Sequence, residues 1–354
     1  MAREGRRKKI KILDLFCGCG GSSLGFKLAM EKLRLNCEIV GVDINRDACI
    51  TFQKNRIGQA VRADARFLPF RLKKGDFDIL IGCPPCQGFT RMRGKPNQQD
   101  PRNALVKVYS KYVKSLLPKY LMFENVPWVR DSHFYHQLAE CLKSCGYKYV
   151  SGVIDAADYG VPQRRKRLIL VASLRGRPKL PEPEHNKVTV REAIGDLPPL
   201  EAGEKHPVIP NHVCMKHNDK VLSRIRTVPK DGGSRKVLPR ELWLTCHLEN
   251  KGYNDVYGRM KWDDVAPTLT TGCTNPSKGR FIHPEQDRAI TPREAARIQT
   301  FPDWFVFFGG LTSISRQIGN AMPIKLAEAI ALACVSSLGI NRLFDFSESK
   351  KRKS

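Results

Sequence analysis

The sequence predicts an α/β fold built on an open parallel sheet, with a small irregular domain added to it. Two observations predict the sheet. A glycine-rich turn at 17–21 joins a short apolar run to a segment of helical period, as at the opening of a nucleotide-binding βαβ unit. A second apolar run, at 77–81, indicates a buried strand that ends in Gly82 and two prolines. The irregular domain is indicated by 174–278, which is rich in Pro, Gly, His and Lys and has few regular periods.

Composition favours a polyanionic partner. The 354 residues include 61 Lys and Arg against 35 Asp and Glu, which gives a net charge of +26. Such an excess is typical of nucleic-acid binding, although it also suits an anionic membrane surface. No apolar run approaches the roughly 20 residues of a membrane span, and no apolar signal core follows the basic start, so we expect neither insertion nor export. Twelve cysteines without a signal peptide indicate a reducing compartment.

The glycine turn predicts a cofactor loop. It lies between a strand at 11–16 and a helix at 22–33, where glycines let the backbone approach a ligand. The dinucleotide fingerprint G-x-G-x-x-G fails because Ser23 takes its last glycine position, so the loop is not specifically an NAD loop. The next strand ends in Asp43, the place of a carboxylate that binds ribose hydroxyls. Asp64, after a third strand, could act similarly toward an adenine amino group. Each acid could equally be a helix cap.

Cys86 follows the strand at 77–81 and is a candidate nucleophile, because chemistry gathers at the carboxyl ends of strands in open α/β sheets. A buried free cysteine is the plainer alternative. The C-x-x-C spacing at 83–86 also occurs in redox proteins and in half of a zinc site. The chain has no second C-x-x-C, so a zinc site would have to borrow from His212, Cys214 and His217. A zinc deaminase is excluded because its H-x-E precedes the cysteine pair, whereas 247–249 follows it.

Further groups are expected at the same edge. A polar, basic loop at 91–102 could form a lid, and a helix at 103–117 follows it. The strand at 120–123 then delivers Glu124. Strands at 147–154 and 167–172 flank the four consecutive cations of 164–167, and this position between buried strands predicts that they line the cleft. Near the end, Thr291 begins a capping box with Pro at the first helical position, and a last helix is expected at 323–338.

Taken in order, six motifs resemble those of the DNA (cytosine-5) methyltransferases. They are the loop at 14–21 with Gly25 and Phe26, Pro84-Pro85-Cys86-Gln87-Gly88, Glu124-Asn125-Val126, Gln163-x-Arg165-x-Arg167, and the stretches 293–297 and 317–321. The likeness runs from about 10 to 333. Three positions depart from the family: it usually has a small residue at Cys17, Glu at Asp43 and Val at Met322. None of these departures touches Cys86, Glu124 or the two arginines.

The resemblance implies a Rossmann-like, AdoMet-dependent fold with AdoMet as methyl donor and no metal. It implies five segments: a basic arm at 1–9, an AdoMet-binding catalytic domain at 10–173, a target-recognition domain at 174–278, a part at 279–340 that completes the catalytic domain, and a basic tail at 341–354, expected to be disordered. The implied catalytic residues are Cys86, Glu124, Arg165 and Arg167. The implied cofactor-binding residues are Phe16, Gly18, Gly20, Gly21, Asp43, Ile44, Asp64, Ala65, Pro84, Asn320 and Ala321.

The chemistry needs these residue types. Cytosine C5 is a poor nucleophile until a thiolate adds at C6, and cysteine can both add and leave again. A nearby arginine favours the thiolate. As the resemblance implies, Glu124 serves N3 as a general acid and Arg165 holds O2. The base must be flipped out of the duplex, and phosphate contacts from the basic surface supply much of the affinity. Residues 174–278 would read base edges.

Two alternatives stay open at this point. Related tRNA cytosine methyltransferases share the core motifs, although their Cys-Phe-Thr recognition motif is missing here. A catalytically silent DNA-binding relative is the other, but it would be expected to lose Cys86 or Glu124. We expect a monomer that acts on double-stranded DNA, with no membrane, and a cognate restriction endonuclease as a conceivable partner. The bare catalytic architecture resembles a prokaryotic enzyme of the cytoplasm, bound to the nucleoid through DNA, whereas the basic tail would also serve as a nuclear signal.

Overall fold

The computed structural model describes residues 9–85, 101–184, 186–245 and 255–337. Several predictions fall outside these residues. They concern Cys86, most of the predicted lid at 91–102, the arm before residue 9 and the basic tail.

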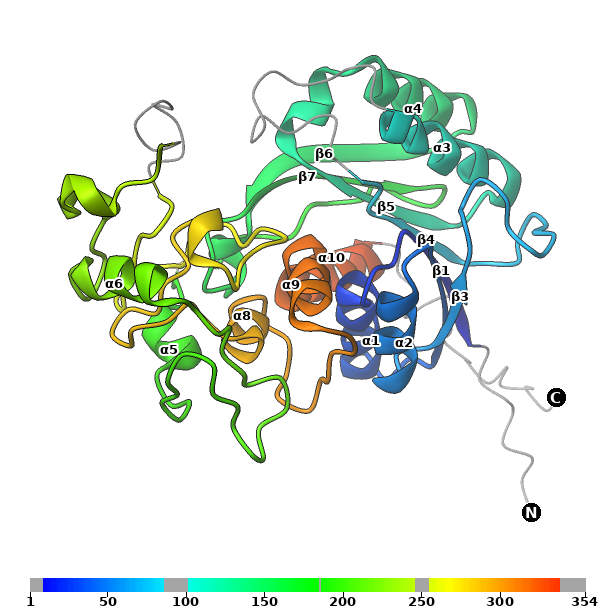
Figure 1. Cartoon of the computed structure of the whole chain (residues 1–354). Helices are drawn as coiled ribbons and strands as arrows, with labels where there is room; N and C mark the ends of the chain where they lie inside the picture. Colours follow the sequence, from blue (N-terminus) through cyan, green and yellow to red (C-terminus); the bar gives the residue numbers. More distant parts are fainter. Residues whose placement is uncertain (1–8, 86–100, 185, 246–254, 338–354) are drawn as a thin grey trace, which may run out of the picture.

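The described residues form one seven-stranded sheet in the order β3-β2-β1-β4-β5-β7-β6 (Figure 1). The strands are β1 Ile10–Leu15, β2 Cys37–Asp43, β3 Gln59–Arg62, β4 Ile79–Gly82, β5 Tyr120–Asn125, β6 Lys148–Asp155 and β7 Lys166–Ser173. The first five strands of that order run parallel, whereas β7 is antiparallel to both β5 and β6. The α/β, Rossmann-like prediction is confirmed, and the carboxyl ends of β1, β2, β4 and β5 meet at one edge.

Helices cover both faces of the sheet (Figure 1). The α-helices of the described residues are α1 Gly21–Lys32, α2 Arg46–Lys54, α3 Leu105–Leu116, α4 His133–Ser144, α5 Val190–Ile194, α6 Asp219–Thr227, α8 Pro292–Ile298, α9 Leu311–Asn320 and α10 Ile324–Ser337. Alternation along β1 divides its side chains between the two layers. Ile10 and Ile12 pack in the core under α1 and α10, and Leu13 and Leu15 pack in the core under α3 and α4.

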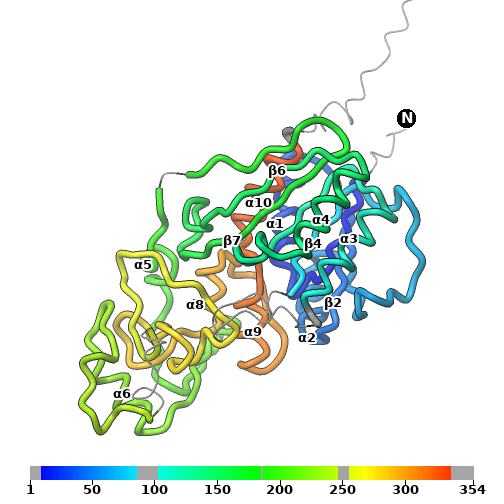
Figure 2. The backbone as a smooth tube through the Cα atoms, turned by 90° about the horizontal axis from the view of Figure 1, so that it is seen from above, coloured from blue at the N-terminus to red at the C-terminus, as the bar shows by residue number. Residues whose placement is uncertain are grey.

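Helices α1 and α10 come from opposite ends of the chain yet lie side by side on the sheet (Figure 2). Their contact depends on glycine. A Cβ on Gly25 would stand 2.4 Å from the Ala327 side chain, and one on Gly21 would stand 2.3 Å from the Met322 carbonyl oxygen. The last described helix therefore completes the layer that holds the cofactor loop.

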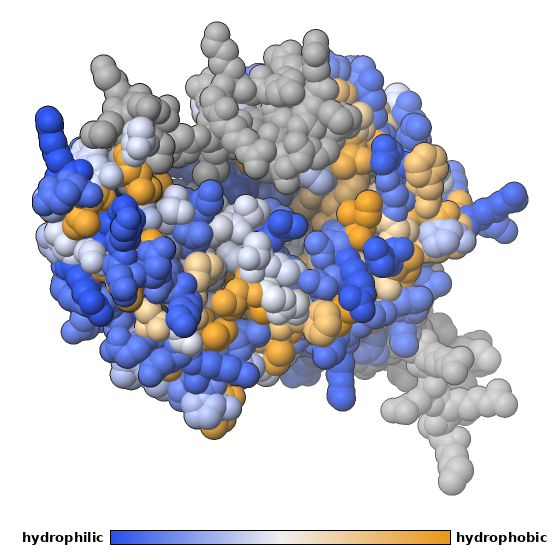
Figure 3. All heavy atoms as spheres, viewed as in Figure 1, coloured by the Kyte–Doolittle hydropathy of each residue, from blue (hydrophilic) through white to orange (hydrophobic). Residues whose placement is uncertain are grey.

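The irregular segment forms a small lobe at the left of Figure 1, in which α5 and α6 are the α-helices among the described residues. It has one small apolar cluster of its own, made by Ile225, Val256, Tyr257 and Ile282. Ile282 lies beyond residue 278, and Met260 and Leu269 pack in the main core. The small lobe is thus joined to the catalytic part through shared packing. Hydrophilic residues prevail on its face in Figure 3.

One stretch, Leu311–Val335, is long and apolar enough by composition to cross a membrane, with a mean hydropathy of 1.4. The sequence-based expectation that no run approached this length was wrong on that count. In the structure this stretch includes α9 and most of α10, and 67% of its most apolar 18-residue window is buried inside the molecule, as in the core helix of a globular protein.

Candidate active site

The edge where four parallel strands end gathers the predicted groups. Leu15 of β1 pairs with Val42 of β2 and with Gly82 of β4. Gly82 in turn pairs with Phe123 of β5. One residue further along each strand, Phe16, Asp43, Cys83 and Glu124 therefore stand in a row along this edge. Ligands in open α/β sheets bind outside this end of the strands.

The cofactor loop holds an unusual backbone shape. Phe16, Gly18 and Gly20 all have positive φ angles, of 64°, 54° and 97°. For Phe16 this conformation is strained, and such strain is often found at functional sites. A Cβ on Gly20 would strike Ile57 and Phe52, whereas one on Gly18 would point into open space. The loop is therefore packed against Ile57 and Phe52 at Gly20 and open at Gly18, where a ligand can approach the backbone.

Asp43 is positioned by the loop itself. Its carboxylate accepts hydrogen bonds from the backbone N–H of Gly18 at 2.8 Å and of Asn45 at 2.8 Å. Burial raises the pKa of this carboxyl, and these two bonds oppose the rise. Its remaining lone pairs can accept from two ribose hydroxyls. Next to it, the Ile44 side chain is 67% exposed, an apolar surface at the edge of the site that can cover an aromatic ring.

Asp14 is a site residue that the sequence analysis noticed only as part of a motif. It is fully buried beneath the cofactor loop and accepts hydrogen bonds from Ser22 at 2.8 Å and Ser23 at 2.6 Å. Burial raises its pKa to about 6, although both serine bonds act in the opposite direction. The two serines begin α1, so the carboxyl ties this helix to β1. An acid within an apolar strand was the signal that could have revealed it.

The other predicted cofactor residues differ in their hydrogen-bond partners and in their exposure. Both carboxylate oxygens of Asp64 accept from Arg66, so this acid is already paired. Ala65 is buried, and its carbonyl accepts from the Tyr112 hydroxyl at 2.7 Å. Asn320 is exposed at the end of α9, while Ala321 is buried beside it.

Glu124 and Arg167 form an ion pair at the mouth of the site. The Arg167 Nε lies 2.9 Å from the Glu124 Oε1, and each side chain is 14% exposed. The pair joins β5 to β7, whose antiparallel register places Glu124 opposite Ile169, two residues from Arg167. Half-buried charges in contact with solvent on one side can meet a polar ligand directly.

Arg165 has a different environment from the one predicted. Its guanidinium is buried and donates to the carbonyls of Leu269 at 3.0 Å, Gly319 at 2.9 Å and Ala321 at 3.2 Å. The prediction that all four cations of 164–167 line the cleft does not match this geometry. Arg164 and Lys166 are exposed, so strand-like alternation separates them from Arg165 and Arg167.

The turn that leads to Cys86 is anchored by residues whose roles the sequence analysis did not identify. The Asn125 side chain donates to the Pro84 carbonyl at 3.1 Å, which links the end of β5 to the turn after β4. Pro84 itself is buried. Gln163 bonds the Gln299 side chain at 2.9 Å and the Leu269 backbone N–H at 2.9 Å. Asn125 and Gln163 therefore hold the backbone of this edge in place.

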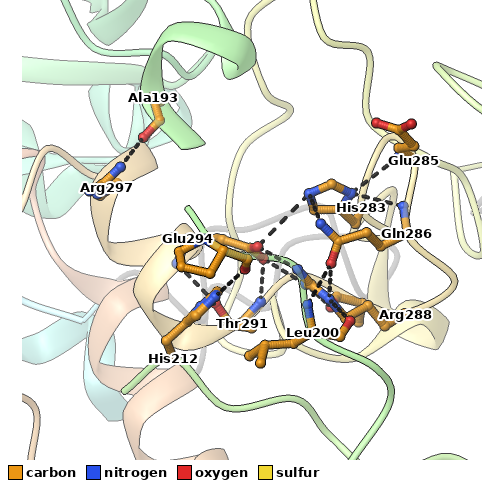
Figure 4. A network of polar contacts seen from close by, with 12 residues as sticks. Ala193, Leu200, His212, His283, Glu285, Gln286, Arg288, Thr291, Glu294 and Arg297 are labelled. Atoms are coloured by element: carbon orange, nitrogen blue, oxygen red, sulfur yellow. Dashed lines mark hydrogen bonds and ion pairs between the residues drawn. The ribbon is translucent and has the colours of Figure 1, made fainter. Parts of the chain in front are cut away.

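A buried polar network joins the small lobe to α8 (Figure 4). Arg288 and Glu294 form a bidentate pair with distances of 2.7 and 2.8 Å, and Glu294 closes the predicted capping box with Thr291. Burial alone would raise the pKa of Glu294, but Arg288 outweighs it and brings that pKa to about 2. Burial lowers the pKa of His283, which lies 3.9 Å from Glu294, to about 4.

His212, one of the residues considered for a zinc site, is engaged in hydrogen bonds instead. Both ring nitrogens of His212 are in hydrogen bonds, to Thr291 at 3.0 Å and to the Pro198 carbonyl at 2.9 Å. Across residues 9–85, 101–184, 186–245 and 255–337 no group of three or more His, Cys, Asp or Glu side chains could hold a metal ion.

A cavity of about 390 Å³ opens at the opposite, amino ends of β1, β2 and β3, where Lys11, Glu38 and Gln59 line it. It lies away from every residue predicted for chemistry. We place the functional site at the carboxyl edge, because the strained loop, the ordered Asp43 and the Glu124–Arg167 pair all occur there.

Comparison with known proteins found a family model, similar sequences and a similar solved structure. The family model of C-5 cytosine-specific DNA methylases matches residues 10–336. The type II methylase M.HgiDII of Herpetosiphon aurantiacus is 36% identical over 338 residues, which cover 90% of this chain and 93% of that protein. The type II methyltransferase M1.HphI of Haemophilus parahaemolyticus is 35% identical and covers 92% and 86% of the two chains. An E. coli prophage-encoded crystal structure, described as a DNA modification methyltransferase, is 24% identical with a TM-score of 0.70, covers 94% and 100%, and shares the fold.

Proposed function

Since the chain belongs to the C-5 cytosine-specific DNA methylase family, and is thus a DNA cytosine-5 methyltransferase, we propose that Cys86 is its nucleophile and that Glu124 and Arg167 hold the target ring. The observation that carries this assignment is the Glu124–Arg167 pair. It stands at the strand edge beside Cys83, which precedes Cys86 by three residues in the chain. A carboxyl group and a guanidinium that share one opening match the N3 and O2 atoms on one edge of cytosine.

In this mechanism the Cys86 thiolate adds to C6 of a cytosine flipped out of the duplex, which makes C5 nucleophilic. Charge that develops toward N3 is met by a proton shared with Glu124. Once C5 carries the methyl group, loss of the C5 proton to a base allows the Cys86–C6 bond to break, and the thiolate leaves. The Asn125 bond to Pro84 ties the backbone two residues before Cys86 to the end of β5.

We assign the O2 contact to Arg167 and give Arg165 a scaffold role. The Arg165 guanidinium already donates to three backbone carbonyls from two distant segments, so turning it toward a base would leave those carbonyls unsatisfied. Arg167 lies beside Glu124 and is open on one side, and its planar fork can donate to O2 while Nε keeps the carboxylate in place.

The cofactor edge fits AdoMet. Open space at Gly18, the Asp43 carboxylate with free lone pairs and the exposed Ile44 side chain match a backbone approach, a ribose diol and an adenine ring. When bound, AdoMet supplies the electrophilic methyl group. Asn320, exposed at the end of α9, would bind its polar tail. Asp64 is paired with Arg66 and would have to exchange that partner to reach the adenine amino group.

DNA is the substrate of this family, and the small lobe is our proposed target-recognition domain. Its hydrophilic face and the net charge of +26 suit phosphate contacts, which would make binding weaken as salt rises. The type II relatives are bacterial, so we propose action in the cytoplasm, with a restriction endonuclease of the same specificity as a partner.

The test is transfer of radiolabelled methyl from AdoMet to duplex DNA and, in parallel, to tRNA, with Cys86→Ser as the matched inactive control. We expect label at cytosine C5 of DNA, and none from the variant. Bisulfite sequencing would then map the recognition site. Label confined to tRNA would contradict the substrate assignment, and label from Cys86→Ser equal to that of the native enzyme would contradict the mechanism.

A further inference from the structure

Gln299 caps the end of α8 and contacts the turn at 320–323 that joins α9 to α10. Its side chain is fully buried, and both of its polar atoms are in hydrogen bonds. Nε2 donates to the carbonyls of Ile318 at 2.7 Å and Ala321 at 3.1 Å, and Oε1 accepts from the Gln163 side chain at 2.9 Å. The chemistry proposed above gives this residue no role.

Gln299 supplies hydrogen-bond partners on both sides of the turn. The last four carbonyls of an α-helix lack donors in its regular pattern, so other groups must satisfy them. At the end of α9, the Gln299 amide serves Ile318 and also Ala321, the first residue past the helix. The Gln299 main-chain carbonyl accepts from the N–H of Ile324, the first residue of α10, at 3.3 Å. One residue thus holds the helix that enters the turn and the helix that leaves it.

The turn lies against the cofactor loop. A Cβ on Gly21 would stand 2.3 Å from the Met322 carbonyl oxygen and 3.3 Å from the Ala321 side chain, so the two segments touch without space to spare. Asn320 stands at the start of the turn and is exposed. A shift of the turn would therefore move Asn320 relative to the loop that approaches the cofactor.

Gln163 sets the orientation of the Gln299 amide. The Oε1 atom of Gln163 accepts from the backbone N–H of Leu269 at 2.9 Å, which leaves its Nε2 to donate to Gln299. Gln163 is fully buried, and its backbone is bridged to that of Ala266. A reversed Gln299 amide would direct its oxygen at two carbonyl oxygens, so this chain of bonds keeps Nε2 directed at the turn.

We propose that Gln299 is a positioning residue for the cofactor site: its amide fixes the turn between α9 and α10 and thereby holds Asn320 against the cofactor loop. Because Gln299 is fully buried, it acts through the turn and not by contact with AdoMet. The proposal rests on the proposed role of Asn320 in binding the polar tail of AdoMet. Loss of the amide leaves two carbonyls of the turn without this donor, so the turn is free to shift.

The experiment measures AdoMet affinity by calorimetric titration of the full chain for Gln299→Met, Asn320→Ala and the double variant. Met keeps the length of the side chain but has no donor. We expect Gln299→Met to weaken AdoMet binding about three- to tenfold, the effect of one net hydrogen bond. In methyl transfer to duplex DNA, KM for AdoMet should rise by the same factor while kcat stays close to native.

The double variant tests the route from Gln299 to the cofactor. Because Gln299 acts through Asn320, the double variant should bind AdoMet about as weakly as Asn320→Ala alone, a non-additive result. Gln286→Met is the matched control. The Gln286 side chain accepts from the Leu200 N–H at 3.1 Å and not from the turn, so this variant should bind AdoMet as the native protein does.

A milder variant covers the case in which Gln299→Met does not fold. Gln163→Met leaves both Nε2 donors of Gln299 in place but removes the bond that orients them. It should weaken AdoMet binding about two- to threefold, less than the loss of the donors themselves. Thermal unfolding of each variant identifies any loss of fold.

Three results would overturn the proposal. Native AdoMet affinity in Gln299→Met, or in Gln163→Met where that variant replaces it, would leave only a packing role. Losses that multiply in the double variant would exclude Asn320 as the route. Equal weakening in Gln286→Met would show a general effect of a lost amide. Native affinity in Asn320→Ala would refute the proposed role of Asn320 and the route through it, whereas methyl transfer by the native chain tests the nucleophile and the substrate separately.

Discussion

At the edge of the sheet, backbone groups are paired by regular strands, and the ionisable side chains Asp43 and Glu124 remain partly open to a ligand. In the small lobe, described residues form few regular elements, and buried arginines bond the backbone instead. Arg259 donates to four carbonyls, those of Ile225, Val228, His283 and Gln286. Next to the lobe, Arg293 of α8 acts in the same way and donates to the carbonyls of Pro210, Pro302 and Phe305.

The difference teaches how an irregular segment can be buried. Carbonyls inside a protein need donors, and a strand supplies them in register whereas a loop does not. A guanidinium carries five donors in a rigid fork, so one side chain can serve carbonyls from several segments. We therefore expect substitutions at the sheet edge to change rate or ligand affinity, and substitutions of buried arginines to change stability.

The largest effect is expected at the edge. Glu124→Gln keeps the size of the side chain and an acceptor for Arg167, but it cannot deliver a proton to N3. We expect the rate of methyl transfer to fall about 10²- to 10⁴-fold. The midpoint of thermal unfolding should stay within about 4 °C of native. A drop in stability that accounts for the lost activity would contradict the expectation that substitutions at the sheet edge change rate rather than stability.

In the small lobe, Arg288→Met should act in the opposite way. It removes the partner of Glu294 and leaves a buried carboxylate uncompensated, which typically costs about 3–5 kcal/mol of unfolding free energy. Chemical denaturation measures this loss. Arg226→Met, at an exposed arginine of α6, is the matched control and should change stability by no more than about 0.5 kcal/mol. Equal losses in the two variants would contradict a special role for the buried guanidinium.

Acid should destabilise the small lobe through His283. Its Nδ1 accepts from the N–H groups of Glu285 and Gln286, so a proton there would break both bonds. The pKa of about 4 lies below the ordinary 6.5, so the unfolded chain binds the proton first and stability falls as pH drops from 6.5 to 4. The charges of Arg288, Arg259 and Lys230 disfavour protonation of His283, and the charge of Glu294 favours it. Burial also lowers the pKa of His212, which therefore adds to the loss of stability in acid.

The expected loss from His283 over that window is roughly 3 kcal/mol. His283→Asn offers an acceptor at the position of Nδ1 but does not titrate, so its stability should vary much less with pH. Denaturant unfolding at the two ends of the window measures the difference. An equally steep dependence in the variant would assign the acid sensitivity elsewhere. Glu294, with its pKa lowered from 4.5 to about 2, adds a loss of its own only at the acid end of the window, where the unfolded chain begins to protonate this carboxylate.

The smallest effect is expected for Asp43→Ala, which tests whether a change at the carboxyl edge alters ligand affinity. Loss of a carboxylate that accepts from ribose should weaken AdoMet binding about ten- to a hundredfold. Calorimetric titration with AdoMet gives the affinity. Glu38→Ala, at the amino end of the same strand, is the control and should bind as the native protein does. Unchanged affinity in Asp43→Ala would remove this residue from the site.

Sequence reasoning predicted what depends on local pattern. The glycine loop, the strand that ends in Asp43 and the one that delivers Glu124 are contiguous signals, and they occur as expected. The environment of Arg165 could not be predicted in this way, because its partners Leu269 and Gly319 lie more than a hundred residues away in sequence. The same holds for Cys83, whose neighbour Glu124 is defined by strand register rather than by spacing.

The contact between α1 and α10 has a consequence for synthesis of the protein. The nascent chain carries the cofactor loop long before α10, but the surface of α1 around Gly25 is covered by Ile324, Ala327 and Glu328 of α10. On the ribosome, α1 must wait with an apolar face uncovered until α10 has emerged. Products of interrupted translation that lack α10 therefore keep the complete AdoMet loop sequence without a finished layer behind it.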